Sequence, residues 1–355
     1  MRFQLDEDLA LLKSSTRELL EKESPLADTR SLMEDSPEGF SKALHGKLGG
    51  LGYLSLLLPP EQGGMGALAL VAVLSEMGRV AFPGPFLDAV LAVRALGDAG
   101  ESRWRDRAAA GEALVVLARR ESVGTGEPAE PSARFRNGSV RGTKLFVPFG
   151  AQADALLVET REGLALVPRP DAGWNAKAMP TLDHAQRFAE IDLNERAEPI
   201  ADREGASRVL ATVDRLGALG ASALLLGLAE RALEMAVAYM KERQAFGVPV
   251  ASFQALQHRA ADMLVQVEGA RSATLRAAWA TDFDPESAAY LSAVAKAWSG
   301  PAARRVCGEA LQMHGGVGFT WEYDPHIYLK RTKTLEQFYG STRSQLEAAL
   351  RARRI

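Results

Sequence analysis

The sequence predicts an α+β fold that is mostly helical, with its strands confined to the middle of the chain. Apolar residues recur at helical spacing up to about residue 112, and long helical patterns return after residue 200. Between them, short alternating segments are separated by turn dipeptides. Because helices and strands are segregated along the chain, the order argues against a parallel βαβ sheet. We expect an N-terminal helical domain (1–112), a β-barrel-like domain (113–200) and a C-terminal four-helix bundle (201–355).

The N-terminal region shows two clear helical patterns. Leucines from Leu5 to Leu20 fall near helical spacing, and residues 68–80 form a second apolar segment. That segment stops before Pro83 and Pro85, which break helices.

The middle and C-terminal regions carry the turn and helix signals that set the expected boundaries. Asn137-Gly138 is the strongest short signal for a β-hairpin, and Glu162-Gly163 predicts a second turn. The C-terminal patterns predict four helices, at Leu210–Lys241, Phe253–Trp279, Pro285–Met313 and Ile327–Arg351.

Composition narrows the class of protein. The chain has 355 residues, a net charge of -3 and one cysteine, Cys307. This balance argues against nucleic acid as the main partner, because phosphate binding needs a concentrated positive surface. Without a disulfide framework, a reducing, cytoplasmic location is expected. The acidic N-terminus does not read as a secretory signal, and the apolar run Leu216–Ala229 is shorter than the roughly 20 residues that span a bilayer.

Segment 242–263, ERQAFGVPVASFQALQHRAADM, contains a candidate anion-binding group. Arg243 is expected at the end of a helix, just before a Phe246-Gly247 turn. Its guanidinium can hold a phosphate with two hydrogen bonds. The alternative is that Arg243 pairs with a carboxylate.

Segment 311–331, LQMHGGVGFTWEYDPHIYLKR, is the second candidate site. Gln312, like Gln254 of the first segment, can hydrogen-bond amide or purine edges. Gly315-Gly316 is expected to end a helix and to let the backbone approach a ligand closely. The alternative is that these glycines only cap the helix.

The order and spacing of these segments resemble the acyl-CoA dehydrogenase family, with the match starting at GLAERALEMAVAYMKERQAFG (227–247). The resemblance implies an oxidoreductase of CH–CH bonds that desaturates an acyl-CoA, from fatty acids or sterol side chains. It implies FAD as cofactor and an electron-transferring flavoprotein as acceptor. It also implies a homo- or hetero-oligomer, because each FAD is held by two chains. The implied contacts to a neighbour's FAD are Arg243, Phe246, Gln254, Gln312, Gly315 and Gly316.

The chain departs from the family at the base that removes the Cα proton. The usual glutamate position holds Tyr339, and a phenol with a pKa near ~10 is a poor base at neutral pH. A second family position for the base holds Gly217. The nearest acids are Asp214 and Glu336, each one helical turn away, so Asp214 is a weak candidate for a displaced base.

The expected β-domain departs as well. A Glu127-Pro128 pair is present, but the family's Gly-Ser-Asp segment is absent. Leu145–Pro148 replaces a segment that holds the flavin ring, and Pro148 has neither an N–H nor a hydroxyl to donate. The chain's own flavin cradle is therefore expected to be eroded.

Three hypotheses follow. In the first, the chain is a subunit that completes a partner's FAD site, as in bacterial hetero-oligomeric members, and lacks the catalytic glutamate. In the second, it is a self-sufficient homo-oligomer with a displaced acid as base. In the third, it is a flavin-free scaffold. No metal site is expected, because the five histidines show no paired ligand spacing.

Overall fold

The computed structural model describes residues 6–124 and 130–353. This part of the chain is mostly helical, which confirms the predicted α+β class. Its contacts divide it into two units. We call residues 30–67 and 83–217 the β-sheet unit, and residues 1–29, 68–82 and 218–355 the helical unit. The three predicted domains are contiguous segments, whereas both units are assembled from separated segments, so the domain boundaries stay a prediction.

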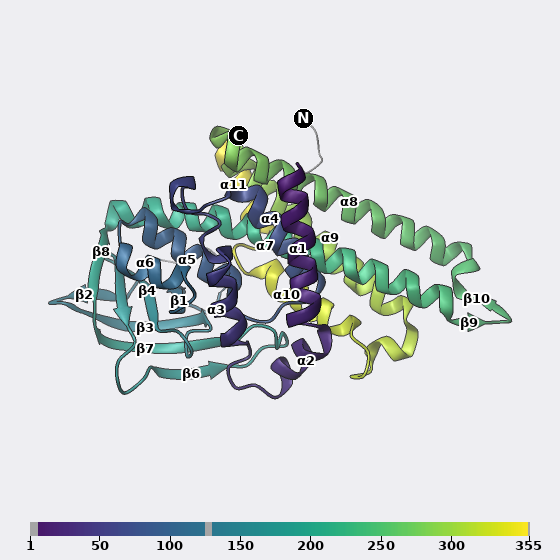
Figure 1. Cartoon of the computed structure of the whole chain (residues 1–355), viewed down its shortest axis with the longest axis horizontal. Helices are drawn as coiled ribbons and strands as arrows, with labels where there is room; N and C mark the ends of the chain where they lie inside the picture. The colour runs from purple at the N-terminus through teal and green to yellow at the C-terminus, as the bar shows by residue number, and fades with distance from the viewer. Residues whose placement is uncertain (1–5, 125–129, 354–355) are drawn as a thin grey trace. The chain divides into compact units, whose positions relative to one another are not determined.

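The β-sheet unit contains two four-stranded sheets (Figure 1). Their strand orders are β1-β4-β5-β8 and β2-β3-β7-β6. β1 pairs with β4 in parallel, and every other neighbouring pair in these sheets is antiparallel. The strands are β1 (Val115–Ala118), β2 (Arg134–Arg136), β3 (Ser139–Pro148), β4 (Ala155–Thr160), β5 (Gly163–Pro168), β6 (Asn175–Met179), β7 (Phe188–Arg196) and β8 (Glu198–Asp202).

Turn chemistry sets the register of the hairpins. Asn137 and Gly138 both have positive φ, as a two-residue type I′ hairpin requires, and they join β2 to β3 as predicted. The second turn was placed one residue too far along. Thr160 pairs with Gly163, so the turn consists of Arg161 and Glu162, and Gly163 is already the first residue of β5.

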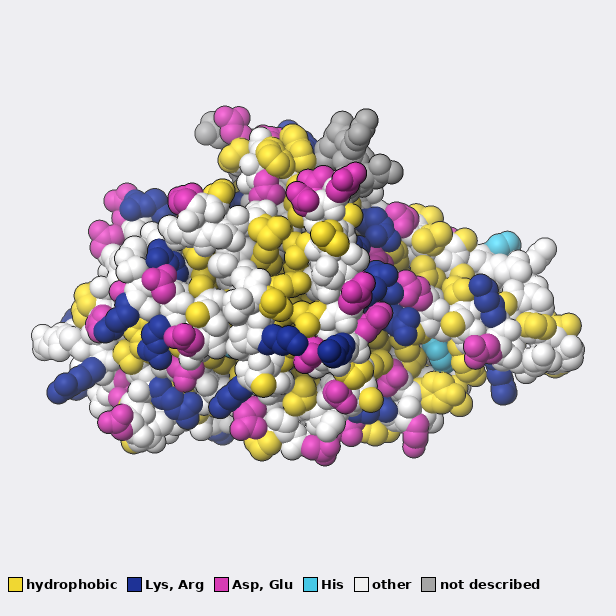
Figure 2. Space-filling model, in the orientation of Figure 1, with side chains coloured by type: hydrophobic (Ala, Val, Ile, Leu, Met, Phe, Trp, Pro, Cys, Tyr) yellow, Lys and Arg dark blue, Asp and Glu magenta, His cyan; other side chains and the backbone are white. Residues whose placement is uncertain are grey.

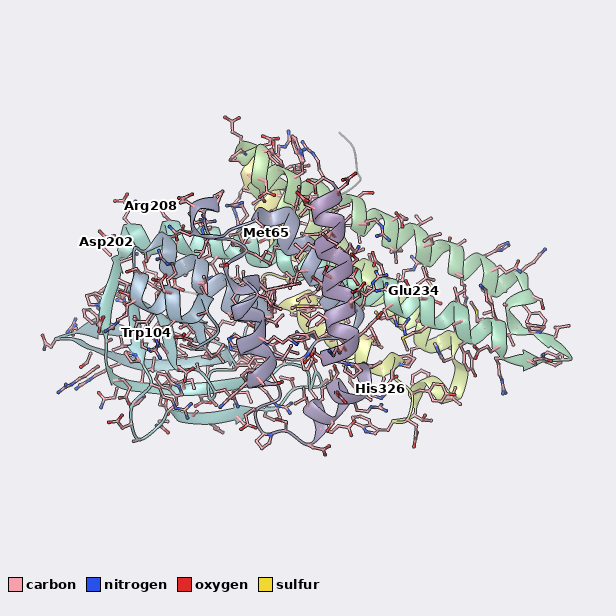
Figure 3. The ribbon with its side chains drawn as sticks, in the orientation of Figure 1. Met65, Trp104, Asp202, Arg208, Glu234 and His326 are labelled. Carbon is pink, nitrogen blue, oxygen red and sulfur yellow. The ribbon has the colours of Figure 1, made fainter. Side chains whose placement is uncertain are left out.

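The helices of the β-sheet unit precede and follow its strands. The first residues of α7 (Arg203–Glu242) belong to this unit, and Asp202, labelled in Figure 3, accepts a hydrogen bond from the Gly205 N–H at 2.8 Å. This bond satisfies one free donor at the helix start. The other helical elements are α2 (Leu26–Glu34), which begins in the helical unit, α3 (Lys42–Gly50), η1 (Tyr53–Ser55), η2 (Pro60–Gln62), α5 (Phe86–Asp98) and α6 (Ser102–Ala109).

The helical unit is built around long helices, and its α8 and α9 run side by side (Figure 1). A short hairpin, β9 (Gln244–Ala245) and β10 (Val248–Pro249), separates α7 from α8. The remaining elements are α1 (Glu7–Glu23), α4 (Gly66–Arg79), η3 (Val250–Ser252), α8 (Gln254–Phe283), α9 (Pro285–Met313), η4 (Gly315–Phe319), α10 (Pro325–Gln337) and α11 (Thr342–Arg353).

The single helix predicted over Ile327–Arg351 was wrong. The chain breaks between α10 and α11, where Tyr339 has φ 58° and Gly340 has φ 96°. Left-handed backbone ends a right-handed helix, and Gly340 was the sequence signal for it. The other three predicted C-terminal helices are present: α7 begins seven residues before the predicted Leu210, α8 ends four residues after the predicted Trp279, and Pro285–Met313 has the predicted bounds.

Two glycines let α4 and α7 cross at van der Waals contact within the helical unit. A Cβ on Gly227 would overlap the Ser75 carbonyl oxygen, and a Cβ on Gly78 would overlap the Leu224 carbonyl oxygen. Because both obstacles are backbone atoms, neither neighbour can move aside by changing a rotamer. The close approach therefore depends on these two residues.

Replacing Gly227 with alanine is expected to destabilise the protein by about 2 kcal/mol, because the added methyl forces the two helices apart. Thermal unfolding measures the loss. Gly308 is the matched control, since it also lies within a helix but has open space where its Cβ would be. Gly308→Ala should leave stability unchanged or raise it. Equal melting temperatures for Gly227→Ala and wild type would contradict this packing.

An ion-pair network joins α1, α4 and α7 beside this crossing. Arg17 donates to both oxygens of Glu76 at 2.8 and 3.0 Å. Arg79 donates to both oxygens of Glu234 at 2.8 and 2.7 Å, and Glu234 is labelled on α7 in Figure 3. Glu76 is 1% exposed, and besides Arg17 it has the Lys13 ammonium and the Arg79 guanidinium at 3.6 Å each, as a buried carboxylate requires. The network fixes helices from distant parts of the sequence against one another.

Among the described residues, one helix, α7, is long and apolar enough to cross a membrane by length and composition alone. In its most apolar window, 78% of the residues are buried inside the protein. Because α7 continues on both sides of Leu216–Ala229, the length of that run alone does not exclude a membrane span. Its burial is the pattern of a core helix.

Candidate functional site

The α7–α8 connection presents the first group of predicted cofactor residues. β9 and β10 are joined by Phe246 and Gly247, with φ of 54° and 78°, which is the signature of a type I′ turn. The Val250 N–H donates to the Arg243 carbonyl at 2.8 Å and closes the hairpin back onto the end of α7. The turn predicted at Phe246-Gly247 is present, and it closes a short hairpin at the end of that helix.

Phe246 has a strained backbone conformation, and its ring packs edge-on against Phe253 with the centroids 6.3 Å apart. Its side chain is 95% exposed, and a positive φ strains a residue that is not glycine. Figure 2 shows hydrophobic side chains exposed at this end of the helical unit, where Val248 and Phe253 accompany Phe246. Exposed apolar side chains grouped on a strained turn are typical of a binding surface.

Arg243 is available to a ligand. It is exposed, and within residues 6–124 and 130–353 no acidic side chain forms an ion pair with it. The carboxylate partner considered as the alternative is therefore not found in that part of the chain. Gln254 is the exposed first residue of α8, and the preceding Phe253 makes no side-chain cap. The Leu256 and Gln257 N–H groups donate to the Phe253 carbonyl at 3.0 and 3.2 Å, so the exposed Gln254 side chain is the group that this helix start presents.

The second group of predicted residues lies where α9 ends. Gln312 is exposed in the last turn of α9. Gly315 has φ 63°, and neither Gly315 nor Gly316 has any atom within 4 Å of the place where a Cβ would lie. By contrast, a Cβ on Gly318 would lie 2.6 Å from the Leu311 carbonyl oxygen. Gly315 and Gly316 therefore expose backbone to solvent, as a close approach by a ligand requires.

These residues fit the adenine and pyrophosphate end of FAD. A phosphate needs a free guanidinium, an aromatic ring system needs an exposed apolar surface, and a close approach needs backbone without side chains. Arg243, Phe246 and the Gly315-Gly316 pair supply these three features. All of these residues lie in the helical unit.

A buried lysine, Lys296, fixes the turn that carries Tyr339. The Lys296 ammonium donates to the Glu336 carbonyl at 3.1 Å and to the Gly340 carbonyl at 2.7 Å. Gln345 donates to the Tyr339 carbonyl at 2.8 Å. Burial lowers the pKa of Lys296 to about 7, against the opposing effect of Glu336. The turn is thus fixed at three carbonyls, and its sequence offers no carboxylate at the Tyr339 position.

The acids nearest to the usual base positions have other partners. Both oxygens of Asp214 accept hydrogen bonds from Arg119, the longer at 3.3 Å. Burial lowers the pKa of Arg119, but the Asp214 and Glu159 carboxylates raise it further, to a net value above the ordinary one. Glu336 pairs with Arg304 at 2.9 Å. Gly217 lies buried within α7 and has no side chain to donate or accept a proton.

The predicted cradle segment in β3 is irregular. The register of β3 against β7 shifts between Lys144 and Val147, and Phe146 has φ 50°. The Phe146 N–H donates to the Met179 sulfur at 3.2 Å. The Arg120 guanidinium lies 5.8 Å from the centre of the Phe146 ring. With Pro148 unable to donate, this segment offers few free donors, and the Glu127-Pro128 pair lies outside the described residues.

Sequence reasoning missed the basic residues of these regions. Arg119 and Arg120 follow β1 as an arginine pair, and that dipeptide was the available signal. Lys296 gave no signal, because it lies in an alanine-rich helix whose other residues read as core. In the described part of the chain, no cluster of three His, Cys, Asp or Glu side chains could hold a metal ion.

Comparisons with known proteins agree with this reading of the fold. Residues 6–109 match the family model "Acyl-CoA dehydrogenase, N-terminal domain", and residues 204–353 match "Acyl-CoA dehydrogenase, C-terminal domain". Acyl-CoA dehydrogenase IpdE2 of Mycolicibacterium smegmatis is 33% identical, over 96% of this chain and 97% of its own. Acyl-CoA dehydrogenase FadE27 of Mycobacterium tuberculosis is 32% identical, over 86% of this chain and 87% of its own.

A solved structure provides the third comparison. The ChsE4-ChsE5 complex from Mycobacterium tuberculosis contains a chain that is 29% identical to this one. The match has a TM-score of 0.87 and covers 99% of this chain and 98% of the other. That structure is a complex of two differently named chains.

Proposed function

The chain belongs to the acyl-CoA dehydrogenase family, whose members are oxidoreductases that act on CH–CH bonds. We propose that it is a subunit that completes a partner's FAD site and does not supply the catalytic base. The observation that carries the proposal is a contrast within the chain. The residues that would reach a neighbour's FAD are exposed and unengaged, whereas both nearby acids that could replace the missing base are held in ion pairs.

In the proposed reaction an acyl-CoA thioester loses a proton from Cα and a hydride from Cβ, and a 2-enoyl-CoA is left. When bound, FAD supplies the hydride acceptor. Arg243 would hold the pyrophosphate, Phe246 would cover the adenine, and Gly315 and Gly316 would admit the dinucleotide close to the backbone. The proton requires a carboxylate with a pKa near the working pH, and we assign it to the partner chain.

The β-sheet unit also supports the proposal that this chain contributes to a partner's FAD site and does not hold a flavin ring of its own. The segment that would hold this chain's own flavin ring has its Phe146 N–H bound to Met179, a proline at position 148 and the Arg120 guanidinium above the Phe146 ring. A cradle for the ring needs free backbone donors, and neither Phe146 nor Pro148 offers one. The ChsE4-ChsE5 complex supports a hetero-oligomer of two family members, and an electron-transferring flavoprotein is the acceptor that we expect.

Replacing Asp214 with asparagine tests where the base resides. We expect the assembled oligomer to keep its acyl-CoA desaturation rate within about twofold, because general-base catalysis is worth 10²–10⁴-fold and Asp214 is bound by Arg119 instead. Glu336→Gln is the companion variant and should behave alike, since Arg304 is half-exposed and can be solvated. A fall of about a hundredfold in kcat for either variant would instead identify that acid as the base of a self-sufficient enzyme.

A further inference from the structure

Three aromatic rings join the two segments that present the cofactor residues. Tyr239 of α7, His314 at the end of α9 and Tyr323 before α10 pack together, and we call these three residues the aromatic clamp. Tyr239 and His314 are stacked, with ring centroids 4.6 Å apart and an interplanar angle of 27°. The Tyr323 ring meets both edge-on, at 6.5 Å from Tyr239 and 6.4 Å from His314.

Tyr239 and His314 each adjoin a different one of the two segments of the site. The Tyr239 carbonyl accepts the Arg243 N–H at 2.8 Å, so Tyr239 and Arg243 lie one helical turn apart on α7. His314 directly precedes Gly315, and its Nδ1 lies 2.7 Å from the Ala310 carbonyl. With 5% exposure, the His314 ring is fixed both by its own helix and by the stack.

The stack spans segments that are far apart in sequence. Arg243 and Phe246 extend from α7, whereas Gln312, Gly315 and Gly316 lie at the end of α9. The β9–β10 hairpin is only two residue pairs long and is marginal on its own. Its position relative to Gly315 therefore depends on contacts at the base of the hairpin, and the Tyr239–His314 stack is such a contact.

We propose that the aromatic clamp positions the Arg243–Phe246 and Gln312–Gly316 segments so that both engage one dinucleotide at the same time. This inference rests on the proposed function, because it assigns a positioning role to residues next to the proposed FAD contacts. Tyr239, His314 and Tyr323 are positioning residues and need not touch the cofactor. A ring at position 239 is required, while its hydroxyl is dispensable.

The test uses Tyr239→Leu and Tyr323→Leu, with Tyr239→Phe as the rescue variant. The matched control is Tyr290→Leu, because Tyr290 also lies on a long helix and packs on the Arg353 guanidinium at 4.2 Å, outside the clamp. FAD affinity of the assembled oligomer is expected to fall about tenfold in both clamp variants, since each loses two ring contacts. Tyr239→Phe and Tyr290→Leu should bind FAD as the wild type does, and all four proteins should melt within a few degrees of it.

Amide hydrogen exchange of the chain without FAD provides a second measurement that does not depend on the proposed function. Residues 244–250 are expected to exchange about tenfold faster in Tyr239→Leu, because the hairpin opens more often once its base is released. Unchanged exchange there would overturn the clamp whether or not FAD binds. Unchanged FAD affinity together with faster exchange would also overturn it, because the segments would then not need a fixed position. Faster exchange in an oligomer that binds no FAD at all would support the clamp and refute the proposed function.

Discussion

Replacing Arg243 with methionine is expected to weaken FAD binding to the assembled oligomer by about 10- to 100-fold. A hydrogen bond to a charged group contributes about 1.5–3 kcal/mol, and a factor of ten in affinity corresponds to about 1.4 kcal/mol. Arg243 is exposed, and no acidic partner in the described part of the chain loses a cation when it is replaced. The loss should therefore appear in binding and not in thermal stability. Fluorescence titration of FAD into the apo-oligomer measures it.

Arg243→Lys separates charge from geometry in the same assay. Lysine keeps the positive charge but cannot form two parallel hydrogen bonds with a phosphate, so an intermediate affinity is expected. Arg259→Met is the matched control, because Arg259 is also exposed on the helical unit and its acidic partner, Glu309, lies at 3.4 Å. An oligomer with Arg243→Met that binds FAD as tightly as the wild type would remove Arg243 from the cofactor site.

The second large effect concerns Lys296 and the pH dependence of stability. Burial lowers the pKa of Lys296 from 10.5 to about 7, so the unfolded chain binds more protons than the folded chain between these two pH values. The free energy of unfolding must then rise as the pH rises from 7 to 10.5, and this increase is lost as the pH falls back towards 7. Between pH 7 and pH 9.5 the contribution is about 3 kcal/mol, at 1.36 kcal/mol per pKa unit.

Replacing Lys296 with methionine should abolish this increment. Urea unfolding gives the free energy of unfolding of wild type and variant at pH 7 and at pH 9.5. The wild type should gain about 3 kcal/mol more than the variant between these two pH values. Lys333→Met is the matched control, because Lys333 is exposed on the neighbouring α10, and it should retain the wild-type pH dependence. A parallel pH profile for wild type and Lys296→Met would show that the Lys296 ammonium is not desolvated as the structure indicates.

Local sequence signals predicted the features that depend on a few neighbouring residues. Asn137-Gly138 and Phe246-Gly247 form the turns expected of them, and the long helices follow their apolar patterns. The place of Arg243 at the end of a helix, just before a turn, was also predicted from local sequence, whereas the sequence left open whether a carboxylate pairs with it. The single helix expected over Ile327–Arg351 failed because periodicity continues across the break, while positive φ at Tyr339 and Gly340 ends the helix.

The interactions that decide the chemistry join residues far apart in sequence, and no local pattern indicates them. Arg119 and Asp214 are 95 residues apart, and Lys296 and Gly340 are 44 residues apart. Asp214 therefore looked like a free acid on a helix, although its oxygens are bound by a guanidinium. Likewise, the Tyr239–His314 stack depends on how α7 and α9 pack.

The FAD content of the purified chain, alone and with a partner, tests the central claim most directly. The partner is a second family member that carries a glutamate at the position equivalent to Tyr339. Flavin absorbance and protein concentration, measured on both preparations together with acyl-CoA desaturation, give FAD per chain and the activity that accompanies it. We predict no FAD and no desaturation for the chain alone, and one FAD with desaturation for each pair of unlike chains. Stoichiometric FAD and desaturation by the chain alone would contradict the account.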